Sequence, residues 1–430
     1  MGRPSSPLSA HLPPLIMGTA TFNSQYNHDP YALPTTDLVH RALTDGVRAF
    51  DTSPYYGPAE ELLGRALASE AVRTAFPRHT YQILTKVGRI ASSSFDYSPR
   101  WVRHSIRRSL QRLHTDYLDA VYCHDVEFVS RAEALDAVRE LRRIRDTEGT
   151  IRYVGISGYP VDVLCEIAEL VLRETGEPLD IVQSYANFTL QNTKLLSQGL
   201  PRLVAAGVDV VPNASPLGMG LLRKEGVPIG SMGDFHPAPD GLRNAVLRVG
   251  AWTDNQMGEK LEVIAIRFAL ERWLRDGAKV GARGLPLARA PNADPSLTPV
   301  TTNGTGERLG VSVMGVSNLG ELDETLRVWR SIVDGLDSGE DEQPQSSAGL
   351  KSEGLVSDRI SSLAQQVQAI LGSEWVDYTW ASPGSDFVNS LPADHLSSLE
   401  EAEEAAAKAR LGAKTFATQP VQVVNKTTHF

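Results

Sequence analysis

Short apolar runs alternate with amphipathic stretches throughout the first 335 residues. The apolar runs predicted as strands are 15–20, 47–51, 81–86, 117–123, 152–157, 180–184, 208–215 and 310–316. The stretches predicted as helices are 35–46, 59–70, 98–113, 131–149, 161–175, 192–207, 259–276 and 321–335. Regular strand–helix repeats with buried strands predict a parallel sheet with right-handed crossover connections.

The number of repeats distinguishes between two architectures. Eight strand–helix units favour a closed (β/α)8 barrel of the TIM type over an open doubly wound sheet. No Gly-x-Gly-x-x-Gly motif follows the first strand, so the sequence does not support a Rossmann dinucleotide site. We therefore predict an α/β fold in which residues 1–335 form one TIM barrel.

Two segments depart from the repeat. Residues 277–309 are rich in Gly, Pro and Ala, which predicts a flexible insertion before the eighth strand. Residues 336–430 begin with a polar stretch typical of a linker. Helical patterns follow at 357–372 and 397–412, so we expect a partly helical C-terminal extension.

Composition limits the partners and the compartment. A net charge of -10 argues against nucleic acid or an anionic membrane as the main partner. The chain shows neither a run of about 18 apolar residues that would span a membrane nor the apolar stretch of a signal peptide. Cys123 and Cys165 lie in apolar runs, which indicates buried thiols rather than a disulfide or a metal site. We expect a cytoplasmic protein without a metal that acts on a small molecule.

Ionisable residues stand where three consecutive predicted strands end. Asp51 ends the second strand and Tyr56 follows it, Lys86 ends the third, and His124 follows the fourth. Each residue alone has an ordinary explanation, as a turn former, a packing ring, a surface charge or a loop histidine. The carboxyl ends of barrel strands meet at one mouth, where barrel enzymes place their active sites. Together the four residues therefore predict one site.

The four side chains suit proton transfer. A tyrosine with an ordinary pKa of about 10 is a poor base at neutral pH. Lys86 is expected to favour the phenolate and lower the pKa of Tyr56, while Asp51 holds the lysine. His124 can orient a substrate oxygen or share the proton. The set predicts a tyrosine acid/base that protonates a carbonyl oxygen or deprotonates an alcohol.

Four stretches resemble the aldo-keto reductases: RAFDTSPYYGPAEELLGRAL, LTKVGR, SLQRLHTDYLDAVYCHD and GTIRYVGISGYP. The resemblance runs from about residue 14 to 335, interrupted by 277–309. It implies a (β/α)8 barrel that binds a nicotinamide cofactor without a Rossmann domain. It also implies that Asp51, Tyr56, Lys86 and His124 form the catalytic tetrad of that family.

The same resemblance implies a set of cofactor contacts. Ser157 and Gly158 stand where the family has a Ser-Asn pair for the nicotinamide carboxamide, and the loop 215–222 resembles the one that covers the cofactor. Ala214 stands where many members stack a tyrosine on the nicotinamide, so that platform differs or is absent. The implied contacts are Gly18, Thr19, Asp51, Ser157, Gly158, Gln183, Ser215, Leu217, Gly220, Leu222, Gly315, Ser317 and Glu321.

The choice between NAD and NADP depends on the stretch 315–325. It carries no basic residue, and Glu321 stands roughly where members specific for NADPH have an arginine. A carboxylate there repels a 2′-phosphate and can accept hydrogen bonds from ribose hydroxyls. We predict NAD, with NADP as the alternative. The alternative is that Glu321 is a solvated first-turn helix residue stabilised by the helix dipole.

Further stretches, SPYYG, YCHD and NASPLGMGLL, resemble the sugar dehydrogenases of the family. This implies oxidation of an aldose of the D-arabinose or L-galactose type at C1 to the aldonolactone, with Tyr56 as general base and hydride transfer to NAD. Two alternatives stay open: an NADPH-dependent reductase of aldehydes or ketones, and a cofactor-binding regulatory subunit. The stretches 22–34 and 223–255 are expected to be substrate loops, and the sequence indicates no oligomeric state.

Overall fold

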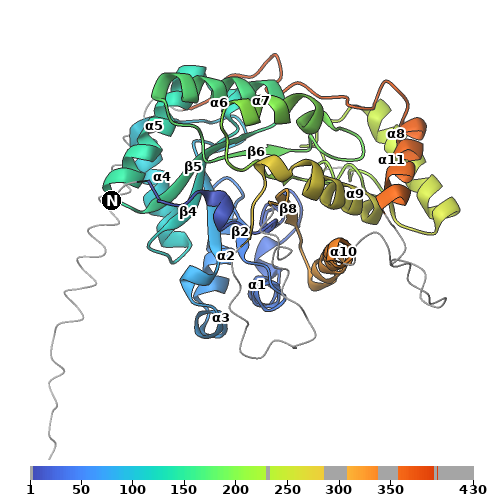
Figure 1. Ribbon diagram of the computed structural model, residues 1–430, viewed down its shortest axis with the longest axis horizontal. Helices are drawn as coiled ribbons and strands as arrows, with labels where there is room; N and C mark the ends of the chain where they lie inside the picture. Colours follow the sequence, from blue (N-terminus) through green and yellow to red (C-terminus); the bar gives the residue numbers. More distant parts are fainter. Residues whose placement is uncertain (1–2, 229–232, 285–307, 338–356, 392–394, 396–430) are drawn as a thin grey trace, which may run out of the picture.

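Eight parallel strands close into a barrel in sequence order (Figure 1). The computed structural model describes residues 3–228, 233–284, 308–337, 357–391 and 395. The strands are β1 (Leu15–Gly18), β2 (Ala49–Asp51), β3 (Gln82–Val87), β4 (Leu118–His124), β5 (Ile151–Gly158), β6 (Ile181–Tyr185), β7 (Asn213–Ala214) and β8 (Ser312–Gly315). The predicted (β/α)8 barrel is thereby confirmed.

Helices surround the barrel (Figure 1). They are α1 (Thr35–Thr44), α2 (Ala59–Ala68), α3 (Glu70–Ala75), α4 (Pro99–Arg112), α5 (Arg131–Thr147), α6 (Val161–Thr175), α7 (Leu200–Ala205), α8 (Asp240–Trp252), α9 (Leu261–Asp276), α10 (Leu319–Asp337) and α11 (Ser357–Leu371). Their ends follow local chemistry. Ser130 and Glu133 form a capping box at the start of α5, and α6 ends at Gly176 with a φ of 70°.

The two-residue period of the strands separates two apolar cores. In β4, Ala120 and Tyr122 belong to a cluster inside the barrel, whereas Val121 and Cys123 belong to the cluster between the strands and the helices. Leu8 and Leu12, which precede β1, complete the inner cluster. Every strand is thus buried on both faces, as the apolar runs predicted.

The seventh unit is less regular than predicted. The predicted strand 208–215 pairs only at Asn213–Ala214 and through a single bridge from Ile181 to Val210. The predicted helix 192–207 begins as a π-helical turn at Leu195–Gly199. Pro201, which has no backbone N–H, stands in the first turn of the α-helix that follows.

The ends of the segment 277–309 belong to the barrel. Val211 donates a backbone hydrogen bond of 2.8 Å to Val280, and Ala282 forms an antiparallel bridge with Leu309. Val280 and Ala282 are buried. The part between 285 and 307 lies outside the described residues, as does the helix predicted at 397–412.

The stretch 223–255 is not only a loop, because it contains α8. Leu242, Val246 and Val249 form the buried face of this helix. α11, from the C-terminal extension, packs against α8 and α9. A Cβ atom on Gly241 would lie 2.4 Å from the Trp375 ring, so the absence of a side chain there lets the extension approach α8. The apolar face of α8 thus depends on residues far along the chain.

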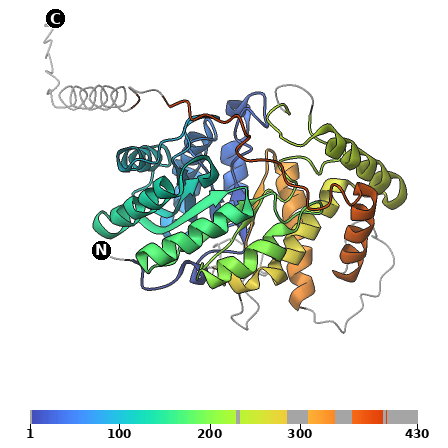
Figure 2. The same ribbon diagram turned by 90° about the horizontal axis from the view of Figure 1, so that it is seen from above.

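After α11, residues 372–391 form a segment that we call the C-terminal strap (Figure 2). Gln191, after β6, donates a hydrogen bond of 2.7 Å to the Trp375 carbonyl. The Trp380 ring stacks on Tyr159, after β5, with the centroids 4.6 Å apart. Near the far end, the backbone N–H of Ser390 donates to the carbonyl of Ser93, after β3. The strap therefore crosses loops at the carboxyl ends of the strands.

Two expectations from composition can be compared with the structure. Cys123 and Cys165 are both free and buried, as their apolar surroundings predicted. In the described part of the chain, no helix is both long enough and apolar enough to cross a membrane.

Gly64 provides a test of the packing between α2 and α4. A Cβ atom at this position would lie 1.9 Å from the Arg112 carbonyl oxygen and 2.8 Å from the Leu113 Cα. Because these are backbone atoms, the helices must separate, and we expect Gly64→Ala to lower the free energy of unfolding by about 1–3 kcal/mol. Gly320→Ala, in an exposed first helical turn, should change it by less than about 1 kcal/mol. Urea denaturation of both variants measures the difference, and equal effects would refute this packing.

Candidate active site

Inward-facing positions at the strand ends bring the predicted residues together. Asp51, Lys86 and His124 follow the inward residues Ala49, Leu84 and Tyr122 by two positions on their own strands. By the same alternation they point into the barrel mouth. The register pairs His124 with Ser157 on β5, and Ser157 with Gln183 on β6. One ring of positions thus carries both the expected catalytic and the expected carboxamide-binding residues.

Asp51 and Lys86 form a buried ion pair. The Lys86 Nζ lies 2.5 Å from Asp51 Oδ1 and 2.9 Å from the carbonyl oxygen of Thr52, and both side chains are at most 3% exposed. Burial raises the pKa of the Asp51 carboxyl, while the Lys86 ammonium and Gln183 oppose this shift. The Lys86 ammonium is therefore paired mainly with the Asp51 carboxylate.

Tyr56 lies in the loop after β2, against Lys86 and His124. The Lys86 Nζ is 5.0 Å from the centroid of the Tyr56 ring, and the His124 ring meets it edge to face at 5.6 Å. The expected lowering of the Tyr56 pKa by Lys86 is wrong for this arrangement. Desolvation in the mouth raises the pKa of Tyr56 well above its usual value, and the carboxylates of Asp51 and Asp125 add to the shift. The neutral phenol is the resting form.

His124 is held as a neutral imidazole. Its Nδ1 lies 3.0 Å from the Ser53 hydroxyl, and its Nε2 lies 3.7 Å from Asp125 Oδ2. Burial lowers the pKa of His124 to about 3; Asp125 opposes this shift, while Lys86 and Arg89 add to it. At neutral pH the ring can therefore donate one hydrogen bond and accept another.

Three further residues at the mouth were missed in the sequence. Arg89 forms an ion pair with Asp125, donates a hydrogen bond of 3.0 Å to the Tyr55 hydroxyl and stacks on the Tyr55 ring at 3.8 Å. The Tyr55 ring lies edge to face with His124 at 5.8 Å. The available signal was position alone: Arg89 stands three residues after Lys86, and Asp125 directly follows His124.

Glu127 explains the glycine at position 158. A Cβ atom on Gly158 would lie 2.5 Å from Glu127 Oε2, so a side chain has no room there. The other carboxyl oxygen accepts hydrogen bonds from the Tyr159 N–H and from the Ser382 hydroxyl of the strap, both at 3.1 Å. Burial raises the pKa of Glu127 to about 8, and Asp125 adds to the shift.

The expected cofactor residues at the first strand mainly contact other parts of the protein. Thr19 donates its hydroxyl to the carbonyl oxygen of Asp51 at 3.1 Å. Gly18 and Gly315 lie in close packing, because a Cβ atom on either would meet Val313 or Thr21 at 3.1 or 3.0 Å. The absence of side chains at these two glycines lets the ends of β1 and β8 lie close to Val313 and Thr21.

The loop 215–222 is tightly turned. Ser215 has a φ of 59°, and its hydroxyl accepts a hydrogen bond of 2.7 Å from the Met219 N–H. Gly220 has a φ of 91°, a conformation that favours glycine. Leu222 is buried and Leu217 is partly buried, and both pack into the outer apolar core. The side chains of Leu217 and Leu222 thus anchor the loop.

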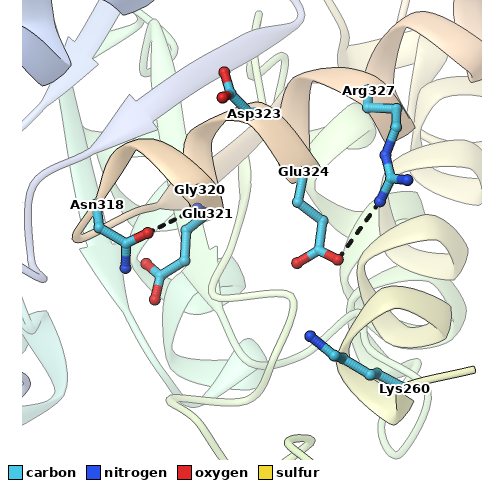
Figure 3. Close-up of a pocket in the computed structure, with 7 residues that line it drawn as sticks. All are labelled: Lys260, Asn318, Gly320, Glu321, Asp323, Glu324 and Arg327. Atoms are coloured by element: carbon cyan, nitrogen blue, oxygen red, sulfur yellow. Dashed lines mark hydrogen bonds and ion pairs between the residues drawn. The ribbon is translucent and has the colours of Figure 1, made fainter.

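Glu321 belongs to a shallow groove of about 550 Å³ at the start of α10 (Figure 3). Its carboxylate accepts a hydrogen bond of 2.7 Å from the Ser317 N–H, and its own N–H donates to Asn318 Oδ1 at 2.9 Å. These bonds fit the helix-start interpretation of Glu321. The groove is lined by Lys260, Asn318, Gly320, Glu321, Asp323, Glu324 and Arg327.

A closed parallel barrel with buried ionisable groups at its carboxyl mouth is the architecture of a barrel enzyme. Residues 14–334 match the model of the aldo/keto reductase family, and the chain belongs to that family. It is therefore an oxidoreductase that uses a nicotinamide cofactor on a small-molecule substrate.

Named relatives agree with this assignment. D-arabinose 1-dehydrogenase from Saccharomyces cerevisiae is 43% identical over 63% of this chain and 79% of its own length. L-galactose dehydrogenase from Arabidopsis thaliana is 37% identical over 54% of this chain and 68% of its own length. A solved glycerol dehydrogenase from Gluconobacter oxydans has the same fold, with a TM-score of 0.50 and 18% identity over 80% of this chain and 98% of that chain.

The Asp51–Lys86 pair gives a first prediction for the site. Lys86→Met leaves the Asp51 carboxylate buried without a counter-charge, so we expect the free energy of unfolding to fall by about 3–5 kcal/mol. Adding Asp51→Asn removes that charge, and the double variant should be more stable than Lys86→Met alone. Chemical denaturation of the two single variants and the double variant measures the coupling. Additive losses would contradict the proposed pair.

His124 gives a prediction about pH. Its folded-state pKa of about 3 lies below the ordinary 6.5, so the unfolded chain binds the proton more tightly. Stability from this group is therefore present above pH 6.5 and is lost as the pH falls towards 3. Between pH 7 and 5 we expect the wild type to lose about 2 kcal/mol more than His124→Gln. Urea denaturation at both pH values measures this, and equal losses would show an exposed imidazole.

Proposed function

We propose that this enzyme oxidises an aldose of the D-arabinose or L-galactose type at C1 to the aldonolactone, with NAD as the hydride acceptor. The observation that carries the proposal is the arrangement of Tyr56 against His124 and the Asp51–Lys86 pair. The substrate class is supported by the relatives that are named as aldose dehydrogenases.

Tyr56 is the general base in this proposal. His124, as a neutral ring, can accept a hydrogen bond from the sugar hydroxyl and so orient it towards the phenol. Because the resting phenol is neutral, proton removal needs positive charge nearby, and Arg89 opposes part of the rise in the pKa of Tyr56. When bound, oxidised nicotinamide supplies the hydride acceptor and a further positive charge. We therefore expect oxidation to become faster as the pH rises.

The residues at the mouth fit a nicotinamide carboxamide. Gln183 Oε1 is buried and has no hydrogen-bond donor among the described residues, and an amide N–H would satisfy it. Ser157 lies beside it in register. Tyr185 pairs in register with Ala214, so an aromatic ring is available next to the position where the family's stacking tyrosine is absent. We propose Ser157, Gln183 and Tyr185 as the residues that hold the ring.

The groove at α10 supports NAD over NADP. It holds the carboxylates of Glu321, Asp323 and Glu324 against the cations of Lys260 and Arg327. Arg327 lies 3.6 Å from Glu324, and Lys260 reaches towards α10 from the opposite wall (Figure 3). Asp323 is paired with Arg41 at 3.0 Å, so the argument for NAD rests on Glu321, whose carboxylate disfavours the added negative charge of a 2′-phosphate.

The raised pKa of Tyr56 also favours a second candidate. A neutral phenol is the proton donor that reduction of a carbonyl oxygen needs. Reduction of aldehydes or ketones by NADPH would use the same four residues in the opposite direction. The two functions differ in cofactor and in pH dependence.

Absorbance of NADH during incubation with NAD, NADP and a panel of aldoses tests the proposal. We expect NADH formation with D-arabinose or L-galactose, faster at pH 9 than at pH 7. Tyr56→Phe should lower kcat by at least about 100-fold, because the proton acceptor is lost. Tyr117→Phe, next to the amino end of β4, is the matched control and should keep its activity. Oxidation of NADPH by aldehydes without turnover of any sugar would establish the reductase instead.

A further inference from the structure

We propose that Arg89 and Asp125 form a positioning pair for His124, in which Arg89 neutralises the carboxylate that lies against the imidazole. The inference rests on the proposed role of His124 in orienting the substrate. Nothing in the resemblance or in the relatives assigns a role to either residue. The pair lies next to the His124 ring at the mouth.

The first observation is where the Asp125 carboxylate lies. Asp125 has a φ of 55°, a left-handed conformation directly after β4. Its side chain is 1% exposed, and its Oδ2 lies 3.7 Å from His124 Nε2. A buried carboxylate this close to an imidazole attracts a proton onto the ring. Without a counter-charge, Asp125 would therefore favour a cationic His124.

The second observation is that Arg89 supplies the counter-charge. Its guanidinium pairs with the same Asp125 Oδ2 atom, and its side chain is only 16% exposed. Both partners lie where solvent screening is weak, so the ion pair has a strong local effect. The ordinary reason for such a pair is to anchor a loop, and that reason alone would leave the protonation of His124 unchanged.

The third observation is that Arg89 also holds the aromatic ring of Tyr55 in place. It holds Tyr55 by stacking at 3.8 Å and by a hydrogen bond of 3.0 Å to the hydroxyl. The Tyr55 ring in turn lies 6.3 Å from Tyr56 and 5.8 Å from His124, centroid to centroid. One guanidinium therefore connects the loops after β2, β3 and β4 around the proton-handling groups.

The charged and titratable groups near His124 are few enough for their effects on its pKa to be tested by substitution. The groups that face it are Lys86 from β3, Arg89 from the loop after β3, Asp125 from its own strand end, and the phenols of Tyr55 and Tyr56 from the loop after β2. Lys86 is already paired with Asp51. Asp125 is thus the anion beside the ring, and Arg89 is its partner.

NMR titration of His124 tests the proposal without substrate or cofactor. The signal is assigned among the ten histidines by its loss in His124→Gln. In the wild type we expect no titration between pH 5 and 8. In Arg89→Met the pKa of His124 should rise by about 2 units or more, which brings its titration into this range, and Arg89→Lys should restore the wild-type behaviour. Arg89→Met with Asp125→Asn should restore it too, because the unbalanced carboxylate is gone.

Two controls separate this role from a purely structural one. Arg145→Met removes another buried arginine, on α5, which pairs with Asp146 and with Glu177 after α6, and it should leave the His124 titration unchanged. Asp125→Asn alone should also leave the ring neutral. The His124 titration in Asp125→Asn therefore still tests the proposal if Arg89→Met folds poorly. An unchanged His124 pKa in Arg89→Met, or a raised one in Asp125→Asn, would overturn the proposal.

The pH dependence of turnover gives the matching functional result. If the pKa of His124 reaches 6.5 in Arg89→Met, kcat/KM should fall about fourfold between pH 8 and pH 6, relative to the change in the wild type. A loss that is equal at every pH would indicate a structural role and overturn the proposal. Absence of sugar turnover in the wild type would refute the proposed function, while the NMR titration would still decide on the pair.

Discussion

The two-residue period of the strands is the constraint on which this site depends. Each strand of the barrel buries one set of side chains inside and the alternate set under the helices. The last inward positions of β2, β3 and β4 are Asp51, Lys86 and His124, and the barrel closes them onto one mouth. Placing ionisable residues there costs desolvation energy, so each must find a partner within the mouth or change its protonation state.

Three arrangements in the site reduce this desolvation energy. Asp51 and Lys86 pair with each other, and His124 stays neutral. Arg89 and Asp125 form a second pair beside the imidazole. Tyr56 lies between these groups, and the carboxylates of both pairs raise its pKa. Because its pKa is raised, the Tyr56 phenol loses its proton with difficulty. Positive charge bound beside it makes this loss easier. Proton transfer at Tyr56 therefore depends on the charged groups that are bound in the mouth.

Much of this could be predicted from the sequence, and the misses have physical causes. The strand–helix repeat and the four strand-end residues are local patterns that the barrel preserves. The predicted direction of the Tyr56 pKa shift was wrong because burial in the mouth desolvates the phenol and the carboxylates of Asp51 and Asp125 add to the rise, and the depth of burial is not visible in residue spacing. Arg89 was missed because a loop arginine near a strand end is usually a surface charge. α8 was missed because its buried face is completed by α11, more than 100 residues later.

The C-terminal strap extends this dependence on distant residues to the mouth itself. It lies beyond residue 334, where the match to the family ends, yet it contacts the loops after β3, β4, β5 and β6. Ser382 binds Glu127, and Trp380 covers Tyr159, so the strap takes solvent away from groups beside the proton-handling residues. Electrostatic interactions strengthen as water is excluded. The hydrogen bond from Ser382 also opposes the rise in the Glu127 pKa, so a residue outside the barrel adjusts the protonation of a group beside the mouth.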